Sequence, residues 1–179
     1  KESDKFLIAE FENKTGDEEF DGILRQPLAV SLSQSPFLTL VPDGQIRQTL
    51  QLMEKGKDEP LSYEIAREVA QRRGIKAFLK GTIETRGVQY LITLETFSTE
   101  SGESVAKEQI ESKNKDTVMT SLGEVASRMR EKLGESLASV KRLDALLKES
   151  VTSSLEALKS YTLGTNAVGE GKNDDAIKH

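Results

Sequence analysis

The residue types that most often carry catalysis are nearly absent from this sequence. It contains no cysteine, and its only histidine, His179, is the last residue. Thiol catalysis, disulfides, iron–sulfur clusters and zinc sites therefore lack their ligands, and a Ser–His–Asp arrangement lacks its base. We expect no catalytic, cofactor-binding or metal-binding residues in this chain, no cofactor, and no enzymatic activity.

One acidic cluster comes closest to a metal site. Asp17, Glu18, Glu19 and Asp21 follow the first apolar run of the chain. Their spacing does not match the calcium-loop pattern, in which acidic or amide residues alternate with others and precede a glycine. The sequence favours a solvated loop whose negative charges stabilise the N-terminus of the following helix.

Three arginines form a second candidate site. Arg67, Arg72 and Arg73 lie on or just after a predicted helix. One interpretation is a site for phosphate or for an acidic partner, and the other is a solvated face near the helix C-terminus. The sequence contains no glycine-rich phosphate-binding motif and no protein-kinase motif. Its formal net charge of −5, with both signs mixed along the chain, argues against nucleic acid binding.

Two largely apolar runs predict buried strands in the first half of the chain. Residues 6–9 and 37–41 are typical of strands that are covered on both faces. Helical patterns follow each run, and Pro27 fits the first turn, or a kink, of the first helix. Asp43 and Ser62 are placed to cap the two helices that come next.

The hydrophobic period then changes from helical to two. Residues 77–83, 88–95 and 105–112 alternate apolar and polar side chains, which predicts a three-stranded antiparallel meander. Charged side chains on the last of these segments are typical of an exposed edge strand. Asp116 is placed to cap a long helix with an apolar stripe over residues 118–133.

These segments predict an α/β (α+β) fold with one mixed sheet of about five strands and helices on its faces. The order is strand, helix, strand, helix, helix, three strands and a long helix, followed by a C-terminal helical extension. The apolar stripes of residues 118–147 leave two interpretations. Their first part covers the sheet and their second part leads onward, or they form a coiled coil with a second chain. A homodimer through the C-terminal helices is therefore a further expectation.

Several segments resemble one family. They are residues 6–17, 20–22, 34–38, 133–140 and 152–158. With the element order, they make the chain similar to TolB amino-terminal-like domains, which are related to curli-assembly and flagellar lipoprotein modules. The resemblance implies a segment of a large bacterial, especially acidobacterial, signalling protein. In such proteins the module follows a serine/threonine kinase, an adenylate cyclase or a winged-helix domain and precedes tetratricopeptide repeats.

The end of the chain resembles the start of a tetratricopeptide repeat. Leu163, Gly164 and Ala176 stand at the spacing of the repeat signature, whereas Ser160 and Ala167 stand where it has aromatic residues. The chain opens on lysine and stops in mid-pattern, so we expect both ends to be cuts in a longer protein. The expected parts are a TolB amino-terminal-like domain at 1–135, a helical connector at 136–151 and a truncated first repeat at 152–179.

Two functions fit these features. The first is a non-catalytic interaction or scaffold module that presents a sheet edge, or the groove beside it, to a protein partner and links an effector domain to the repeats. The second is a small-ligand sensor, which needs a pocket beyond the ends of the first two strands. We expect a protein partner, no nucleic acid, and no membrane insertion of this segment, because no apolar run is long enough to span a bilayer. The resemblance implies the extracytoplasmic (periplasmic) part of a membrane-anchored bacterial protein, with the cytoplasm as the alternative.

Overall fold

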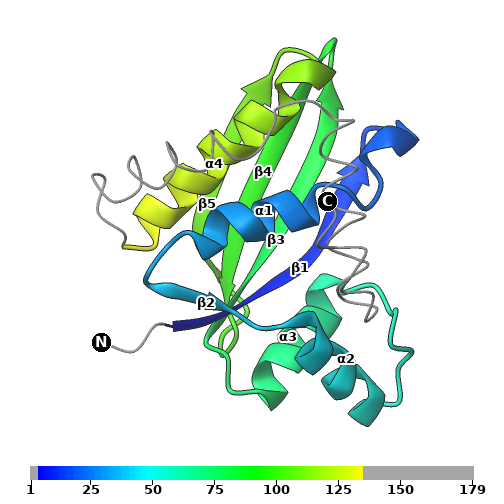
Figure 1. Ribbon diagram of the computed structural model, residues 1–179, viewed down its shortest axis with the longest axis vertical. Coiled ribbons are helices and arrows are strands. Elements are labelled where there is room, and N and C mark those ends of the chain that lie inside the picture. Colours follow the sequence, from blue (N-terminus) through cyan, green and yellow to red (C-terminus); the bar gives the residue numbers. More distant parts are fainter. Residues whose placement is uncertain (1–3, 135–179) are drawn as a thin grey trace, which may run out of the picture.

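The computed structural model describes residues 4–134. It contains one five-stranded sheet with the strand order β2-β1-β3-β4-β5 (Figure 1). The elements are β1 (Asp4–Lys14), the short 3-10 helix η1 (Glu18–Phe20), α1 (Arg25–Ser33), β2 (Leu38–Leu40), α2 (Asp43–Leu52), α3 (Tyr63–Arg72), β3 (Ala77–Arg86), β4 (Gln89–Ser98), β5 (Ser104–Ser112), the 3-10 helix η2 (Lys115–Thr117) and α4 (Val118–Lys132). The mixed sheet and the order of its elements confirm the fold class that the sequence predicts.

β1 lies in the middle of the sheet, as its apolar run predicts. Phe6, Leu7, Ile8 and Ala9 are each exposed by 3% or less. β1 pairs in parallel with β2 on one side and with β3 on the other. Parallel neighbours need a crossover connection, so α1 leads from β1 to β2, and α2 and α3 lead from β2 to β3.

β3, β4 and β5 form the antiparallel meander that the period of two predicts. Gly87 and Val88 make the tight turn between β3 and β4, and Gly87 supplies the positive φ of 64° that such a turn favours. β5 ends the sheet at this side. The long edge strand of the described domain is therefore β5, whereas β2 is a short edge at the other side.

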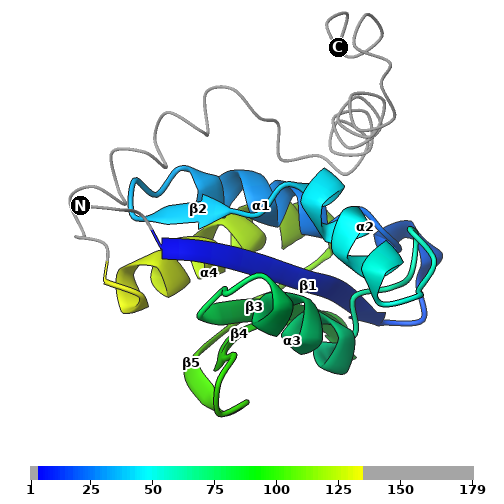
Figure 2. The same cartoon turned by 90° about the horizontal axis from the view of Figure 1, so that it is seen from below.

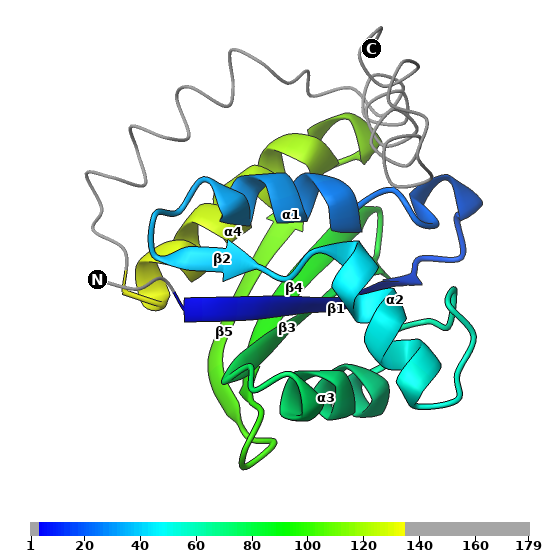
Figure 3. The same cartoon turned by 60° about the horizontal axis from the view of Figure 1, so that its bottom comes forward.

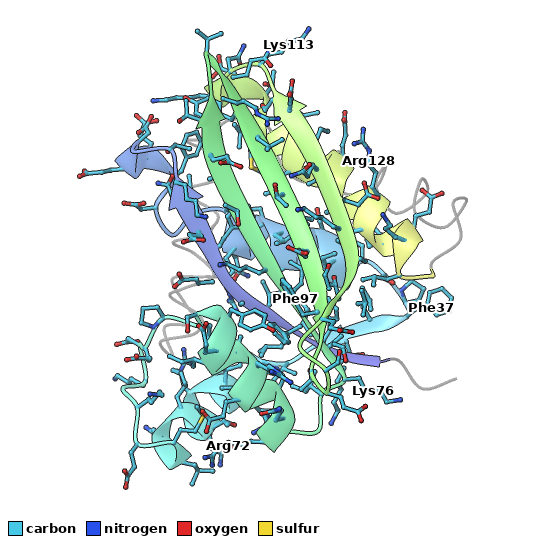
Figure 4. All side chains as sticks on the ribbon, turned by 180° about the vertical axis from the view of Figure 1, so that it is seen from behind. Phe37, Arg72, Lys76, Phe97, Lys113 and Arg128 are labelled. Atoms are coloured by element: carbon cyan, nitrogen blue, oxygen red, sulfur yellow. The ribbon has the colours of Figure 1, made fainter. Side chains whose placement is uncertain are left out.

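Helices cover the two faces of the sheet unequally. α1 and α4 pack on one face, over a core that includes Leu79 and Val125 (Figures 2 and 3). α2 and α3 pack on the other face, over a second core that includes Leu7 and Val69. This second pair reaches β1 and one end of β3, whereas β4 and β5 stay bare on that face over most of their length (Figure 4). The fold thus leaves half of one sheet face without a helical cover.

The apolar stripe of α4 faces the sheet. Val118, Leu122, Val125 and Met129 are each exposed by 1% or less. Because this stripe is buried within the domain, it does not provide the free face that a coiled coil with a second chain would need. The later part of the predicted stripe lies outside the described residues.

The prediction of a second strand buried on both faces is wrong. β2 is only three residues long, and its side chains are half exposed or exposed. Phe37, which comes just before β2, is 46% exposed. β2 pairs with β1 alone, and a strand with one neighbour at the sheet edge is covered less than a central strand.

Two predicted helix caps also differ from those in the structure. Pro42 rather than Asp43 occupies the N-cap of α2, and it makes no side-chain cap bond. Asn114 rather than Asp116 caps the turn that starts η2 and α4, because its Oδ1 accepts from the Thr117 N–H at 3.1 Å. In both places an upstream residue has the extended backbone that the cap position requires. Ser62 caps α3 as predicted and accepts from the Ile65 N–H at 3.4 Å.

The predicted connector at 136–151 and the truncated repeat at 152–179 lie outside the described residues. The three-part division of the chain therefore stays a prediction. Within residues 4–134, no helix combines the length and the apolar composition that a bilayer crossing requires.

Candidate interaction surface

The bare face of the sheet is built by alternate residues of four strands. Leu79, Ile83, Ile92 and Leu94 belong to the core under α1 and α4, so the residues beside them in sequence point to the opposite face. We call this opposite face the open face. Its residues are Glu12 and Lys14 of β1, Lys80, Thr82 and Glu84 of β3, Leu91, Thr93 and Glu95 of β4, and Lys107, Gln109 and Glu111 of β5.

Charges alternate in sign along one cross-strand row of the open face. The strand register places Lys80 beside Glu95, and Glu95 beside Lys107. Cross-strand neighbours of opposite charge stabilise a sheet. The next row is neutral, and in it Gln109 Nε2 donates to Thr93 Oγ1 at 3.2 Å. Mixed charges in this arrangement suit a protein partner better than a nucleic acid, which requires a basic surface.

Glu12 is held on the open face by two lysines. Its carboxylate lies 3.1 Å from Lys80 Nζ and 3.6 Å from Lys14 Nζ. Burial acts to raise the pKa of Glu12, but the hydrogen bond and the positive charge of Lys80, supported by Lys14, outweigh it. The pKa of Glu12 therefore lies below its ordinary value, and the carboxylate is ionised at neutral pH.

Apolar side chains lie among the charged ones. Leu91 is only 6% exposed although no helix covers it. Phe97 lies where α3 meets the sheet (Figure 4). Its ring packs edge to face against Tyr63, with 5.0 Å between centroids, and stacks on Phe78 at 5.5 Å. This aromatic cluster forms the border between the part of the sheet that α3 covers and the open face.

α3 also holds the loop between β4 and β5. Tyr63 Oη donates to the Gly102 carbonyl at 2.6 Å. Arg67 donates to the carbonyls of Thr99 and Glu100 at 2.9 and 2.7 Å. Sequence reasoning missed this clamp, because Thr99 lies 32 positions after Arg67 and no local pattern connects them.

The other two arginines of the predicted cluster also bind groups of the protein itself. Arg72 pairs with Glu68 at 3.0 Å along the exposed side of α3. Arg73 donates to Gln45 Oε1 at 2.7 Å and to Thr49 Oγ1 at 2.9 Å, which ties α3 to α2. The solvated-face interpretation fits Arg72, whereas Arg67 and Arg73 are structural ties between elements.

Two side chains of α4 lie along the outer edge of β5. Arg128 Nη1 donates to the Gln109 carbonyl at 3.3 Å, and Lys132 Nζ donates to the Lys107 carbonyl at 3.1 Å. Lys132 also pairs with Glu108 at 3.2 Å. Basic side chains at a sheet edge hinder pairing with another strand. The strand edge that the sequence offers to a partner is therefore partly occupied.

A groove lies where β1 and β2 send their helices to opposite faces of the sheet. This is the topological switch point, at which open α/β sheets often bind ligands. The groove has a volume of about 400 Å³, is open to solvent, and runs between α1 and the start of α2. Arg25 stands at its side, where its Nη2 donates to the Ile8 carbonyl at 2.8 Å and its Nη1 lies 3.4 Å from Asp43. The sequence places a sensor pocket here, and the structure shows an open groove rather than an enclosed cavity.

The acidic cluster after β1 is a capped turn. Asp17 caps η1 by accepting from the Glu19 N–H at 3.0 Å, and Asn13 Nδ2 donates to Asp21 Oδ1 at 2.7 Å. Lys115 pairs with Asp17 and lies 3.6 Å from Glu19, and its hydrogen bond to Asp17 raises the pKa of Lys115. Residues 4–134 contain no group of three or more potential ligands placed to hold a metal ion. The acids therefore stabilise η1 and not, as predicted, the following helix.

Comparison with known proteins finds similarity in fold. No family profile and no curated protein matches the sequence. The C-terminal domains of LpoB from Salmonella enterica and from Escherichia coli are similar in structure, with TM-scores of 0.56 and 0.57. Each likeness covers 61% of this chain and 82% of the LpoB chain, at 15% sequence identity. The described domain has an LpoB-like fold.

TolB from Acinetobacter baumannii is a weaker match. Its TM-score is 0.49 at 15% identity, and the likeness covers 75% of this chain and 29% of TolB. Likeness at this level does not establish a shared family, so the relation to TolB amino-terminal-like domains stays a prediction from the sequence. That the parent protein contains a kinase and tetratricopeptide repeats likewise stays a prediction from the sequence.

Proposed function

We propose that the LpoB-like domain is a non-catalytic interaction and scaffold module that binds a protein partner through its open face. The observation that supports this is the bare half of the sheet (Figure 4), where Lys80, Glu95 and Lys107 alternate in charge across three neighbouring strands. A surface with charges of both signs selects a partner by charge complementarity and contributes more to specificity than to affinity. The partner is therefore a protein surface of matching charge pattern.

The wider setting of the module is also part of this proposal. We place it in a larger bacterial signalling protein, with a serine/threonine kinase before it and tetratricopeptide repeats after it, on the extracytoplasmic side of a membrane anchor. The resemblance of residues 6–17 and 152–158 to such proteins supports this setting, and a cytoplasmic location is the alternative. Reporter fusions at both ends of the domain in the parent protein test the compartment. A cytoplasmic signal from both fusions would replace the extracytoplasmic assignment.

A small-ligand sensor is the second candidate function. The groove at the switch point supports it, because Val30 and Leu40 provide apolar lining beside the polar groups of Arg25 and Asp43. In that case a ligand would bind in the groove and would alter the activity of the attached kinase or cyclase.

Two substitutions separate these functions. Thr93→Arg places a bulky charge in the centre of the open face, and Val30→Trp fills the groove. The matched control for the first is Gln48→Arg, on the exposed side of α2. The partner is first trapped with a photo-crosslinking residue at Thr93 in the parent protein, with Gln48 as the control position, and is then titrated against purified variants.

For an interaction module we expect Thr93→Arg to weaken partner binding by about tenfold or more, since a buried unpaired charge is costly at an interface. Gln48→Arg and Val30→Trp should bind like the unaltered protein. Equal crosslinking from Thr93 and Gln48, or full binding by Thr93→Arg, would contradict the open-face proposal. Loss of effector regulation in Val30→Trp alone would establish the sensor instead.

A further inference from the structure

At alternate residues of β5, the backbone N–H and C=O groups point away from the sheet, along its outer edge. The carbonyls of Lys107 and Gln109, two positions apart, both accept from α4 side chains that lie outside the strand pair. In an antiparallel pair, residues alternate between those that bond to the neighbour and those that point outward. Lys107, Gln109 and, by the same alternation, Glu111 therefore direct their backbone groups outward along the edge.

The two α4 side chains that occupy this edge are easily displaced. Arg128 is exposed and projects past the edge of β5 (Figure 4). The Lys132 side chain is 49% exposed and is shared between the Lys107 carbonyl and Glu108. Contacts of exposed, long side chains contribute little to stability because holding them costs entropy and water competes for them. Arg128 and Lys132 therefore oppose weak pairing of another strand with β5, but they do not exclude a strand that fits this edge well.

The edge of β5 is complementary to itself. Lys107, Gln109 and Glu111 point to the same face, and they carry a positive, a neutral and a negative side chain. When two copies pair antiparallel with Gln109 at the centre, Lys107 of each copy lies opposite Glu111 of the other. Cross-strand pairs of opposite charge stabilise an antiparallel pair, and like charges destabilise it.

Other registers lack this complementarity. Centring the pair on Lys107 places two lysines opposite each other, and centring it on Glu111 places two glutamates opposite each other. Placing Lys107 opposite Gln109 leaves both charges without an opposite neighbour. Among the registers that pair Lys107, Gln109 and Glu111 with one another, only the one centred on Gln109 forms two Lys–Glu pairs, so the charges of these three residues favour it.

We propose that the β5 edge is a pairing surface for a second copy of this chain, with Gln109 at the two-fold axis and with Arg128 and Lys132 closing the edge in the monomer. In the pair, backbone hydrogen bonds between the two β5 strands replace the two side-chain bonds, and the two sheets become continuous. Both copies of α4 then lie on the same face of the joined sheet. This edge adjoins the open face, because Gln109 Nε2 donates to Thr93 Oγ1. The two proposals have different readouts, namely self-association of this chain and binding of a different protein, so either proposal can fail alone.

Sedimentation equilibrium of the full 179-residue chain tests the role of the two basic side chains. Arg128→Ala combined with Lys132→Ala removes both donors from the edge, and we expect its dimer dissociation constant to fall by about tenfold or more. Arg128→Lys combined with Lys132→Arg keeps a donor at each position and should behave like the unaltered chain. An Ala variant that dimerises no more tightly than the unaltered chain would overturn the proposal.

Charge exchange in the Ala variant tests the register. Lys107→Glu and Glu111→Lys, made singly, each place like charges opposite one another, and each should weaken the dimer by about tenfold. The two together restore the Lys–Glu pairs in exchanged positions and should restore the dimer. Failure of the combined exchange to restore dimerisation, in variants whose circular dichroism shows a folded chain, would show that the copies pair elsewhere.

Discussion

Gly81 shows how a single residue shapes the central pair of strands. It lies beside Phe11 across the β1–β3 pair, just after an irregularity in the register. A Cβ at Gly81 would lie 2.5 Å from Phe11 Cδ2 and from Cε2, much closer than carbon atoms approach. The ring of Phe11 therefore occupies the space that a side chain at position 81 would need.

We expect Gly81→Ala to lower the free energy of unfolding by about 1–3 kcal/mol, because the Phe11 ring must leave its position. Urea unfolding measures the change. Gly123→Ala is the matched control, since nothing lies within 4 Å of its added Cβ and alanine favours the helix of α4 over glycine. Equal effects of the two substitutions would contradict the close approach of Phe11 and Gly81.

The ionisation of Glu12 makes the free energy of unfolding depend on pH. Because its pKa in the folded chain is lowered, its contribution is present above the pKa of the unfolded chain and is lost as the pH falls through the folded value. The side chain is 34% exposed, so the contribution is small, about 0.5 kcal/mol. As the pH falls, the free energy of unfolding decreases, and we expect Glu12→Gln to remove the part of this decrease that Glu12 causes. Urea unfolding at a series of pH values measures it. A variant with an unchanged pH profile would show that the two lysines do not stabilise the carboxylate.

At the scale of elements, the tie between α3 and the β4–β5 loop explains how the end of the meander is held. Tyr63 combines a ring in the aromatic cluster with a hydroxyl that donates to the Gly102 carbonyl. The ring and the hydroxyl can be separated experimentally, because phenylalanine keeps the first and loses the second.

We expect Tyr63→Phe to lower the free energy of unfolding by about 1 kcal/mol and to speed hydrogen exchange in the loop, since one bond to the loop is lost. Tyr90→Phe is the control. Its ring packs on Phe20 at 5.2 Å between centroids, and among the described residues its hydroxyl makes no hydrogen bond. A loop whose exchange is the same in both variants would show that the hydroxyl of Tyr63 does not hold it.

At the scale of the whole domain, two cores share one sheet. Leu28 of α1 belongs to the core on one face, and Leu50 of α2 belongs to the core on the other. β1 contributes to both, with Ile8 on the first side and Leu7 on the second. Loss of either core therefore removes the support of the central strand.

We expect Leu28→Ala and Leu50→Ala each to lower the free energy of unfolding by about 2–5 kcal/mol, and each variant to unfold in a single transition. Native-state hydrogen exchange should show the same loss of protection for slowly exchanging amides on both sides of the sheet. If Leu50→Ala affected only the amides of α2 and α3, the part of the domain on that face would be an independent unit.

The sequence by itself determined which segments form strands and helices. The apolar run of residues 6–9 predicts a central strand, and the alternation over residues 77–112 predicts the meander, because both patterns depend only on which side chains must be buried. Caps were less accurate. Asp43 and Asp116 have suitable side chains, but the backbone one or two residues upstream turns first.

Only the tertiary structure decided which part of the sheet is exposed and which distant residues bind one another. The open face exists because α2 and α3 cover one end of the sheet and leave β4 and β5 bare, and no local pattern states which part of a sheet a helix will cover. The same is true of the clamp from Arg67 to Thr99 and of the bonds from Arg128 and Lys132 to β5. Each joins residues that are distant in sequence, so the folded arrangement of the layers, rather than the local period of the chain, brings their atoms together.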